Sequence, residues 1–144
     1  MDLYYRSVGH NGNLLLNANP DRDGLIPALD MRRYKEFGAE IRRRFARPVA
    51  QTSGRGDAVE LALKTPARID HVVAMEDITQ GARVREYVVA GLTNDGWKEL
   101  CRGTSIGHKK IDRIAPVDVA AIRLRCTRSA AEPIIRQLAV YDAR

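Results

Sequence analysis

Residues 57–144 contain short runs in which apolar side chains alternate with polar or small ones. In the run from Val119 to Thr127, for example, Ile122, Leu124 and Cys126 are separated by arginines. Because successive side chains of a β-strand point to opposite faces, this period of two predicts half-buried strands. The predicted strands are 59–63, 69–75, 84–89, 97–101, 106–114, 119–127 and 134–141. Short strands at this spacing predict a β-sandwich of the jelly-roll type.

Turn-forming residues separate the predicted strands. The sequence Thr93-Asn94-Asp95-Gly96 is typical of a β-hairpin turn. Pro66, Pro116 and Pro133 are each expected just before a strand, where the missing backbone N–H costs least.

The first 46 residues have a different pattern. The run Asn13-Leu14-Leu15-Leu16-Asn17 does not alternate, which predicts a strand buried on both faces, as in a parallel sheet. Turn-forming residues follow over 19–24, and then a helix from Asp30, its predicted N-cap, to Phe45. Its apolar residues form one helical stripe, made of Met31, Tyr34, Phe37, Ile41 and Phe45.

A single parallel strand cannot pair its backbone groups with itself, so the neighbours of 13–17 are missing. Residues 1–46 are therefore expected to be the last strand and helix of a larger α/β domain, with 3–5 as the end of a preceding helix. Residues 47–56 carry Pro, Ser and Gly and are predicted to be a linker. Residues 57–144 form the predicted sandwich.

The positive charge is concentrated in the first part of the chain. The net charge is +6, from 24 basic and 18 acidic residues. Residues 1–56 hold ten basic and six acidic groups, and Arg42, Arg43 and Arg44 lie at the helix end, where the helix dipole favours cations. This cluster is expected to be a solvated face, so nucleic acid is not an expected partner. No run of 18 apolar residues occurs, so no membrane span is expected either.

Two parts of the sequence resemble one known family. Residues 7–20, followed by 23–27, resemble glycoside hydrolase family 29, the α-L-fucosidases, in which a Gly-Gly-Asn-Leu-Leu-Leu-Asn-x-x-Pro segment lies on the last strand of a (β/α)8-like barrel. Gly12 matches the second glycine, whereas Asn11 replaces the first. The remainder resembles the C-terminal, discoidin-like and galactose-binding-like sandwich of those enzymes. The matching segments are 75–78, 81–87, Trp97, 103–111, 122–124, 133–135 and 140–141.

The resemblance implies a mainly β chain, in which a strand-turn-helix remnant of the barrel precedes the sandwich. Retaining glycosidases need two carboxyl groups about 5 Å apart, and in this family they come from earlier parts of the barrel. The chain is thus expected to be a C-terminal fragment of an α-L-fucosidase-like glycoside hydrolase that is inactive alone. Its sandwich would support the barrel and contact a fucosylated glycan or another carbohydrate. The alternative is a stand-alone carbohydrate-binding module without catalytic activity.

The expected protein partners are the missing barrel or a second copy of the chain, bound through the helix 31–45. The compartment is left open, and would be periplasmic or secreted if the parent enzyme carries a signal peptide. No cofactor is expected. No metal site is expected either, because His10, His71 and His108 lack ligand spacing, and residues 51–56 replace an Asp-rich, calcium-associated segment of many discoidin-type modules.

Five residues are candidates for specific roles. Asn17, at the end of the barrel strand, and His108 with Lys109 are predicted to contact substrate. Glu76 and Arg83 are predicted to form a bond that holds the loop between them. Asp21 and Asp23 are interpreted as turn carboxylates.

The remaining candidates have structural interpretations. His71 is expected to be half-buried with its hydrogen bonds satisfied, and Trp97 to be part of the core. Cys101 and Cys126 are interpreted as free thiols, although a disulfide is possible if their Cα atoms lie within about 7 Å.

Overall fold

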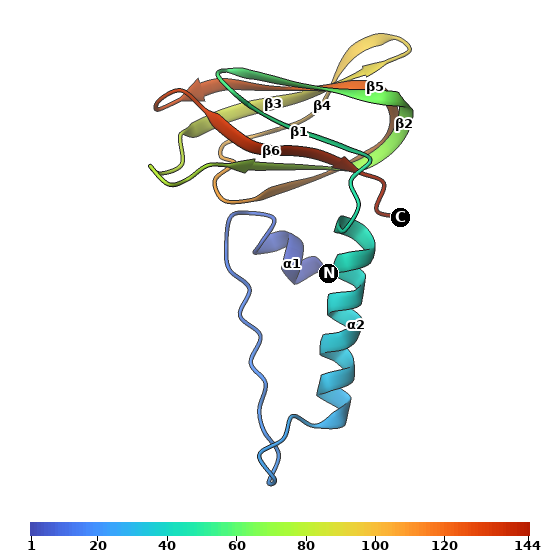
Figure 1. Cartoon of the computed structure of the whole chain (residues 1–144), viewed down its shortest axis with the longest axis vertical. Helices are drawn as coiled ribbons and strands as arrows, with labels where there is room; N and C mark the ends of the chain where they lie inside the picture. The colour runs from blue at the N-terminus through green and yellow to red at the C-terminus, as the bar shows by residue number, and fades with distance from the viewer.

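A computed structural model describes residues 1–144, the whole chain. A β-rich body forms one end of the molecule, and two helices extend from it (Figure 1). The helices are α1 (Asp2–Arg6) and α2 (Ala28–Phe45). The strands are β1 (Ala50–Arg55), β2 (Ala58–Glu76), β3 (Val84–Thr93), β4 (Gly96–Gly103), β5 (Lys110–Ser129) and β6 (Ile134–Tyr141). Neither helix is both long and apolar enough to cross a membrane.

The six strands form one antiparallel sheet in the order β1-β6-β2-β5-β3-β4. The long strands β2 and β5 belong to both layers of the sandwich. The first half of β2 and the second half of β5 form one layer together with β3 and β4. The second half of β2 and the first half of β5 form the other layer together with β6 and β1. The sheet thus folds over on itself and encloses a core (Figure 1). The predicted β-sandwich is confirmed.

The predicted runs 59–63 and 69–75 form one strand, β2, and most of 106–114 joins 119–127 in β5. Pro66 and Pro116 therefore lie inside strands rather than before them. Both fall where the pairing of β2 with β5 is interrupted, so neither ring removes a hydrogen bond from a regular ladder. Pro133 does precede β6, as predicted.

The segment 47–56, expected to be a linker, contains β1, which forms one edge of the sheet beside β6. Its polar sequence gives no hydrophobic alternation, and its strand conformation depends on backbone hydrogen bonds with β6. The hairpin turn after Thr93 is confirmed, and Gly96 takes the positive φ of 98° that this turn requires.

Helix α2 confirms the predicted helix, but the predicted cap is wrong. Pro27 precedes the first turn and no side chain caps it, while Asp30 lies within that turn. The predicted strand 13–17 does not form in this chain. The segment is extended but unpaired, and Leu15 is 86% exposed. The chain has no parallel neighbours that could bind this segment's backbone, so it cannot become a strand here.

The sandwich contacts only part of the helical stripe. Phe37, Ile41 and Phe45 contact a small apolar cluster on the outer face of the sandwich. The cluster comprises Tyr4, Tyr5, Val73, Ile111, Ala139 and Tyr141. Met31 and Tyr34, nearer the start of α2, are outside it. The sandwich therefore holds the last half of α2, and the first half projects away from it (Figure 1).

Candidate functional site

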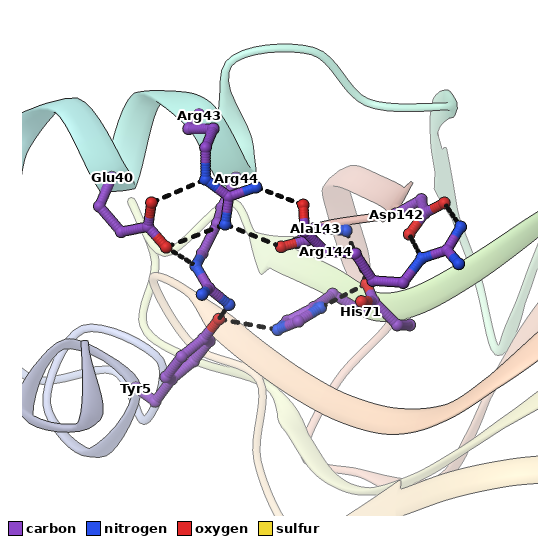
Figure 2. A network of polar contacts seen from close by, with 9 residues as sticks. Tyr5, Glu40, Arg43, Arg44, His71, Asp142, Ala143 and Arg144 are labelled. Carbon is purple, nitrogen blue, oxygen red and sulfur yellow. Dashed lines mark hydrogen bonds and ion pairs between the residues drawn. The ribbon is translucent and has the colours of Figure 1, made fainter.

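A buried polar network joins the helices to the sandwich (Figure 2). Nε2 of His71 lies 2.8 Å from the hydroxyl of Tyr5, and Nδ1 lies 2.6 Å from Oδ1 of Asp70. The same carboxylate oxygen accepts a hydrogen bond from the backbone N–H of Ala143 at 2.8 Å. His71 is 5% exposed, so it is fully buried rather than half-buried, and both its ring nitrogens have partners as predicted.

Arginines at the end of α2 surround this network. Arg43 and Arg44 both donate hydrogen bonds to Glu40, which lower the pKa of that carboxyl to about 2. Arg44 also donates to the hydroxyl of Tyr5 at 3.2 Å, and Arg43 donates to the backbone carbonyls of Ala143 and Arg144. These two cations therefore hold the C-terminus of the chain against α2, instead of forming only a solvated face.

Lys109 lies in the same junction. Its Nζ is 3.2 Å from the hydroxyl of Tyr4 and 5.7 Å from the centre of the Tyr4 ring, and it also lies over Phe45 at 5.9 Å. These contacts direct the ammonium group toward the helices, so the side chain of Lys109 packs between the sandwich and the helices.

The other two substrate-contact candidates lie apart from each other. His108 is exposed, and its backbone N–H is held by the side chain of Asn11. Asn17 is in the extended segment, where its carbonyl accepts a hydrogen bond from Tyr34. Tyr34 precedes Phe45 by eleven residues, so Asn17 lies about 16 Å along α2 from the sandwich. The three candidates therefore do not form one site.

A polar pocket lies beside His108, on the outer face of β1 and β6. Its volume is about 440 Å³, and it is lined by Gln51, Thr52, Ser53, Met75, Arg136 and Gln137. Nη2 of Arg136 lies 3.3 Å from the backbone carbonyl of His108. We call this cavity the β1–β6 pocket. Sequence reasoning missed it, because residues 51–53 were assigned to a linker and only strand pairing brings them beside Gln137.

Glu76 holds the loops at one end of the sandwich. Its side chain is buried, and its two carboxylate oxygens accept hydrogen bonds from the backbone N–H groups of Arg83, Val84 and Gly107 at 2.7–3.0 Å. The predicted contact between Glu76 and Arg83 is present, but it uses the backbone of Arg83. The guanidinium of Arg83 instead binds Gln80 and the carbonyl of Glu132.

The remaining candidates are structural. Trp97 is 40% exposed on edge strand β4, so its assignment to the core is wrong, and the guanidinium of Arg123 lies 4.2 Å from the centre of its ring. Asp21 accepts hydrogen bonds from the backbone N–H groups of Asp23 and Leu25, as expected of a turn carboxylate.

Both cysteines are free thiols. Burial raises the pKa of Cys126 to about 11, and burial together with the nearby Asp112 carboxylate raises that of Cys101 further. No group of three or more His, Cys, Asp or Glu side chains is arranged to hold a metal ion.

The sandwich has a fold like that of a carbohydrate-binding module. A family 32 carbohydrate-binding module of Streptococcus pneumoniae EndoD superposes with a TM-score of 0.54 at 15% identity, over 62% of this chain and 74% of that one. No protein-family model matches the chain.

The family follows from longer matches. A "putative alpha-L-fucosidase" of Bacteroides thetaiotaomicron has a TM-score of 0.97 and 39% identity, over 99% of this chain and 33% of that chain. A glycoside hydrolase 29 family member of an unknown rumen bacterium has a TM-score of 0.86 and 31% identity, over 99% of this chain and 28% of its own.

A curated relative from Oryza sativa subsp. japonica, "Putative alpha-L-fucosidase 1", is 27% identical over 98% of this chain and 34% of its own length. The chain is homologous to the C-terminal part of glycoside hydrolase family 29 α-L-fucosidases. It spans about a third of the length of these relatives.

Proposed function

We propose that the chain acts as the C-terminal part of an α-L-fucosidase, in which residues 13–17 and α2 complete a catalytic barrel and the sandwich supports it. The catalytic carboxylates would come from a part of the enzyme outside this chain. One observation carries the proposal: Leu14, Leu15 and Leu16 form an extended, unpaired apolar segment beside the uncovered half of an amphipathic helix.

The uncovered surface has the chemistry of a domain interior. A mainly apolar cavity of about 370 Å³ lies between the extended segment and α2, lined by Met1, Asp2, Leu3, Leu14, Leu16, Arg33, Tyr34 and Phe37. Leu25 and Leu29 are also exposed nearby. A neighbouring parallel strand would pair the free backbone groups of 13–17, and barrel helices would cover the leucines.

The direction of residues 13–17 indicates which end of the proposed barrel would face the sandwich. Residues 13–17 run away from the sandwich, and the turn at 21–24 lies at the far end of the molecule (Figure 1). The 18 residues of α2 place that turn about 27 Å from the sandwich. Barrel active sites lie where the strands end, so Asn17 would be on the catalytic side and the sandwich on the opposite side.

Joining this chain to the missing part tests the proposal. The first two thirds of the Bacteroides thetaiotaomicron relative would be fused to residues 1–144, and hydrolysis of p-nitrophenyl α-L-fucoside measured. We expect no activity from the 144-residue chain alone and clear activity from the fusion. A matched fusion with Leu14→Asp and Leu16→Asp should lose it. Hydrolysis by the isolated chain would show that the catalytic carboxylates lie within residues 1–144 and would refute the proposal.

A stand-alone carbohydrate-binding module is the second candidate. It is supported by the likeness to the family 32 module and by the polar β1–β6 pocket. Fucose complexes are known for a Ruminococcus gnavus GH29 fucosidase, a relative with 23–24% identity to this chain. Glycan-array binding by the isolated chain, together with an inactive fusion, would favour this candidate over the first.

A further inference from the structure

The β1–β6 pocket has donors and acceptors that suit a sugar. Nε2 of Gln137 donates a hydrogen bond to Oε1 of Gln51 at 3.0 Å, which fixes both amides. The amide nitrogen of Gln51 and the amide oxygen of Gln137 are then directed to other partners, and the hydroxyl of Ser53 can both donate and accept. Sugar hydroxyls also both donate and accept, so this lining can bind several of them.

The pocket has one apolar side chain in its lining. This residue is Met75, and its half-buried side chain packs against the apolar cluster on the outer face of the sandwich. The C–H groups on one face of a pyranose ring need such a surface, and methionine adapts its shape to the group it contacts. The volume of about 440 Å³ falls in the range of small-molecule pockets.

The charge at the rim is positive. Arg136 forms no ion pair with a carboxylate within 4 Å, in contrast to Arg43, Arg102 and Arg123. Its contacts are the backbone carbonyl of His108 at 3.3 Å and Nδ1 of the same residue at 3.5 Å. These contacts use Nη2 alone, so the other guanidinium N–H groups of this exposed side chain stay available.

One carboxylate lies in the vicinity. Asp77 has its pKa lowered mainly by hydrogen bonds from Thr79, with a smaller contribution from the charges of Arg136 and Arg55. The side chain of Asp77 is not part of the pocket lining and forms no ion pair with Arg136 within 4 Å. A guanidinium with free N–H groups binds a carboxylate through two parallel hydrogen bonds.

From these contacts we propose that the β1–β6 pocket binds a sugar that carries a carboxylate, a uronic acid, with Arg136 on the carboxylate and the Gln51–Gln137 pair on the hydroxyls. The pocket is next to the junction with the helices. Met75 and Gln137 are each two residues along their strands from Val73 and Ala139, which the helices cover. The site rests on the second candidate function, which uses the same pocket, and not on the barrel, so its failure would leave the role of the chain as the C-terminal part of a fucosidase untouched.

Calorimetric titration of the 144-residue chain tests this site. The ligands are D-galacturonate and D-glucuronate, with D-galactose, D-glucose, L-fucose and acetate as comparisons. We expect at least one uronate to bind, with the matching neutral sugar and acetate at least tenfold weaker. Equal affinity for the neutral sugar would overturn the role of the carboxylate, equal affinity for acetate would overturn the sugar site, and no uronate binding would overturn the proposal.

Two variants locate the binding. Arg136→Gln should weaken uronate binding at least tenfold, and Ser53→Phe should abolish it by filling the pocket. Arg125→Gln, on an exposed arginine of β5 whose strand neighbours are β2 and β3, is the matched control and should leave affinity unchanged. Circular dichroism melting would confirm that each variant is folded. Unchanged affinity in both pocket variants would place the ligand elsewhere and refute the site.

Discussion

The hydroxyl of Tyr5, in α1, lies 2.8 Å from Nε2 of His71, in strand β2 of the sandwich. Their rings are also stacked, with centroids 5.4 Å apart and planes at 24°. The two residues are 66 positions apart in sequence, and the guanidinium of Arg113 lies over the Tyr5 ring at 4.9 Å. This buried contact fixes the position of the helices on the sandwich.

Tyr5→Phe should therefore destabilise the chain. The substitution leaves Nε2 of the buried His71 without its partner, which typically costs about 1–3 kcal/mol. Urea denaturation followed by circular dichroism would measure the free energy of unfolding. Tyr34→Phe is the control, because its hydroxyl is in an exposed contact, and a change within about 0.5 kcal/mol is expected there. Equal losses in the two variants would contradict the role of Tyr5.

Glu76→Gln should be the more damaging change. The two carboxylate oxygens of Glu76 accept hydrogen bonds from three backbone N–H groups, at Arg83, Val84 and Gly107, and an amide would turn an N–H donor toward one or two of them. We expect a loss of about 2–4 kcal/mol, since hydrogen bonds to a buried charged group are stronger than average. Glu132→Gln, at an exposed side chain, should change the free energy of unfolding by less than about 0.5 kcal/mol.

The two thiols should react slowly while the chain is folded. With a pKa of about 11, roughly one Cys126 in a thousand is a thiolate at pH 8, against about one in four for an unperturbed thiol. Titration with Ellman's reagent should show both cysteines reacting at least tenfold faster in urea than in buffer. Rapid reaction of either thiol in the native chain would contradict its burial.

The raised pKa of Cys126 also predicts a pH dependence of stability. Because the folded state favours the neutral thiol, the stabilisation it provides is fully present below about pH 8.5, the ordinary value, and is lost as the pH rises toward 11. The Cys126→Ser variant should show a smaller fall in the free energy of unfolding over this range. An identical fall in the two proteins would assign the effect to other groups.

Leu15→Ser should leave the stability of the isolated chain unchanged and lower the stability of the fusion with a barrel. In the isolated chain the side chain is 86% exposed, so the substitution should leave the melting temperature unchanged and reduce binding of the dye ANS. In the fusion the same change should lower stability by about 2–4 kcal/mol, because there the leucine would be buried. An unchanged melting temperature in both proteins would argue against burial by a barrel.

The sequence alone predicted the type of most elements. Alternation over 59–63 of β2 and 119–127 of β5, and periodicity in α2, identified these elements because each pattern depends on which face of an element is buried, and this is a local pattern. The mergers of predicted strands into β2 and β5 were not predictable in this way. Pro66 and Pro116 read as strand boundaries, and only the interrupted pairing of the two strands shows that each can lie inside one.

The candidate sites depended more on tertiary structure. Lys109 and His108 are adjacent in sequence, yet one side chain enters the helical junction and the other borders the β1–β6 pocket. No periodicity indicates which neighbour receives each side chain, since strand pairing and helix docking decide it. The pairing of β1 with β6 likewise brought Gln51 to Gln137, 86 positions away.

The unpaired run at 13–17 shows what the sequence determines and what the tertiary structure decides. The sequence by itself determined that Leu14, Leu15 and Leu16 are apolar enough for a strand covered on both faces. Whether they form that strand was decided by tertiary structure, because backbone N–H and C=O groups of a parallel strand have partners only on neighbouring strands. In this chain those neighbours are absent, and Leu15 and Leu16 remain exposed while Leu14 packs partly against the apolar cluster beside α2.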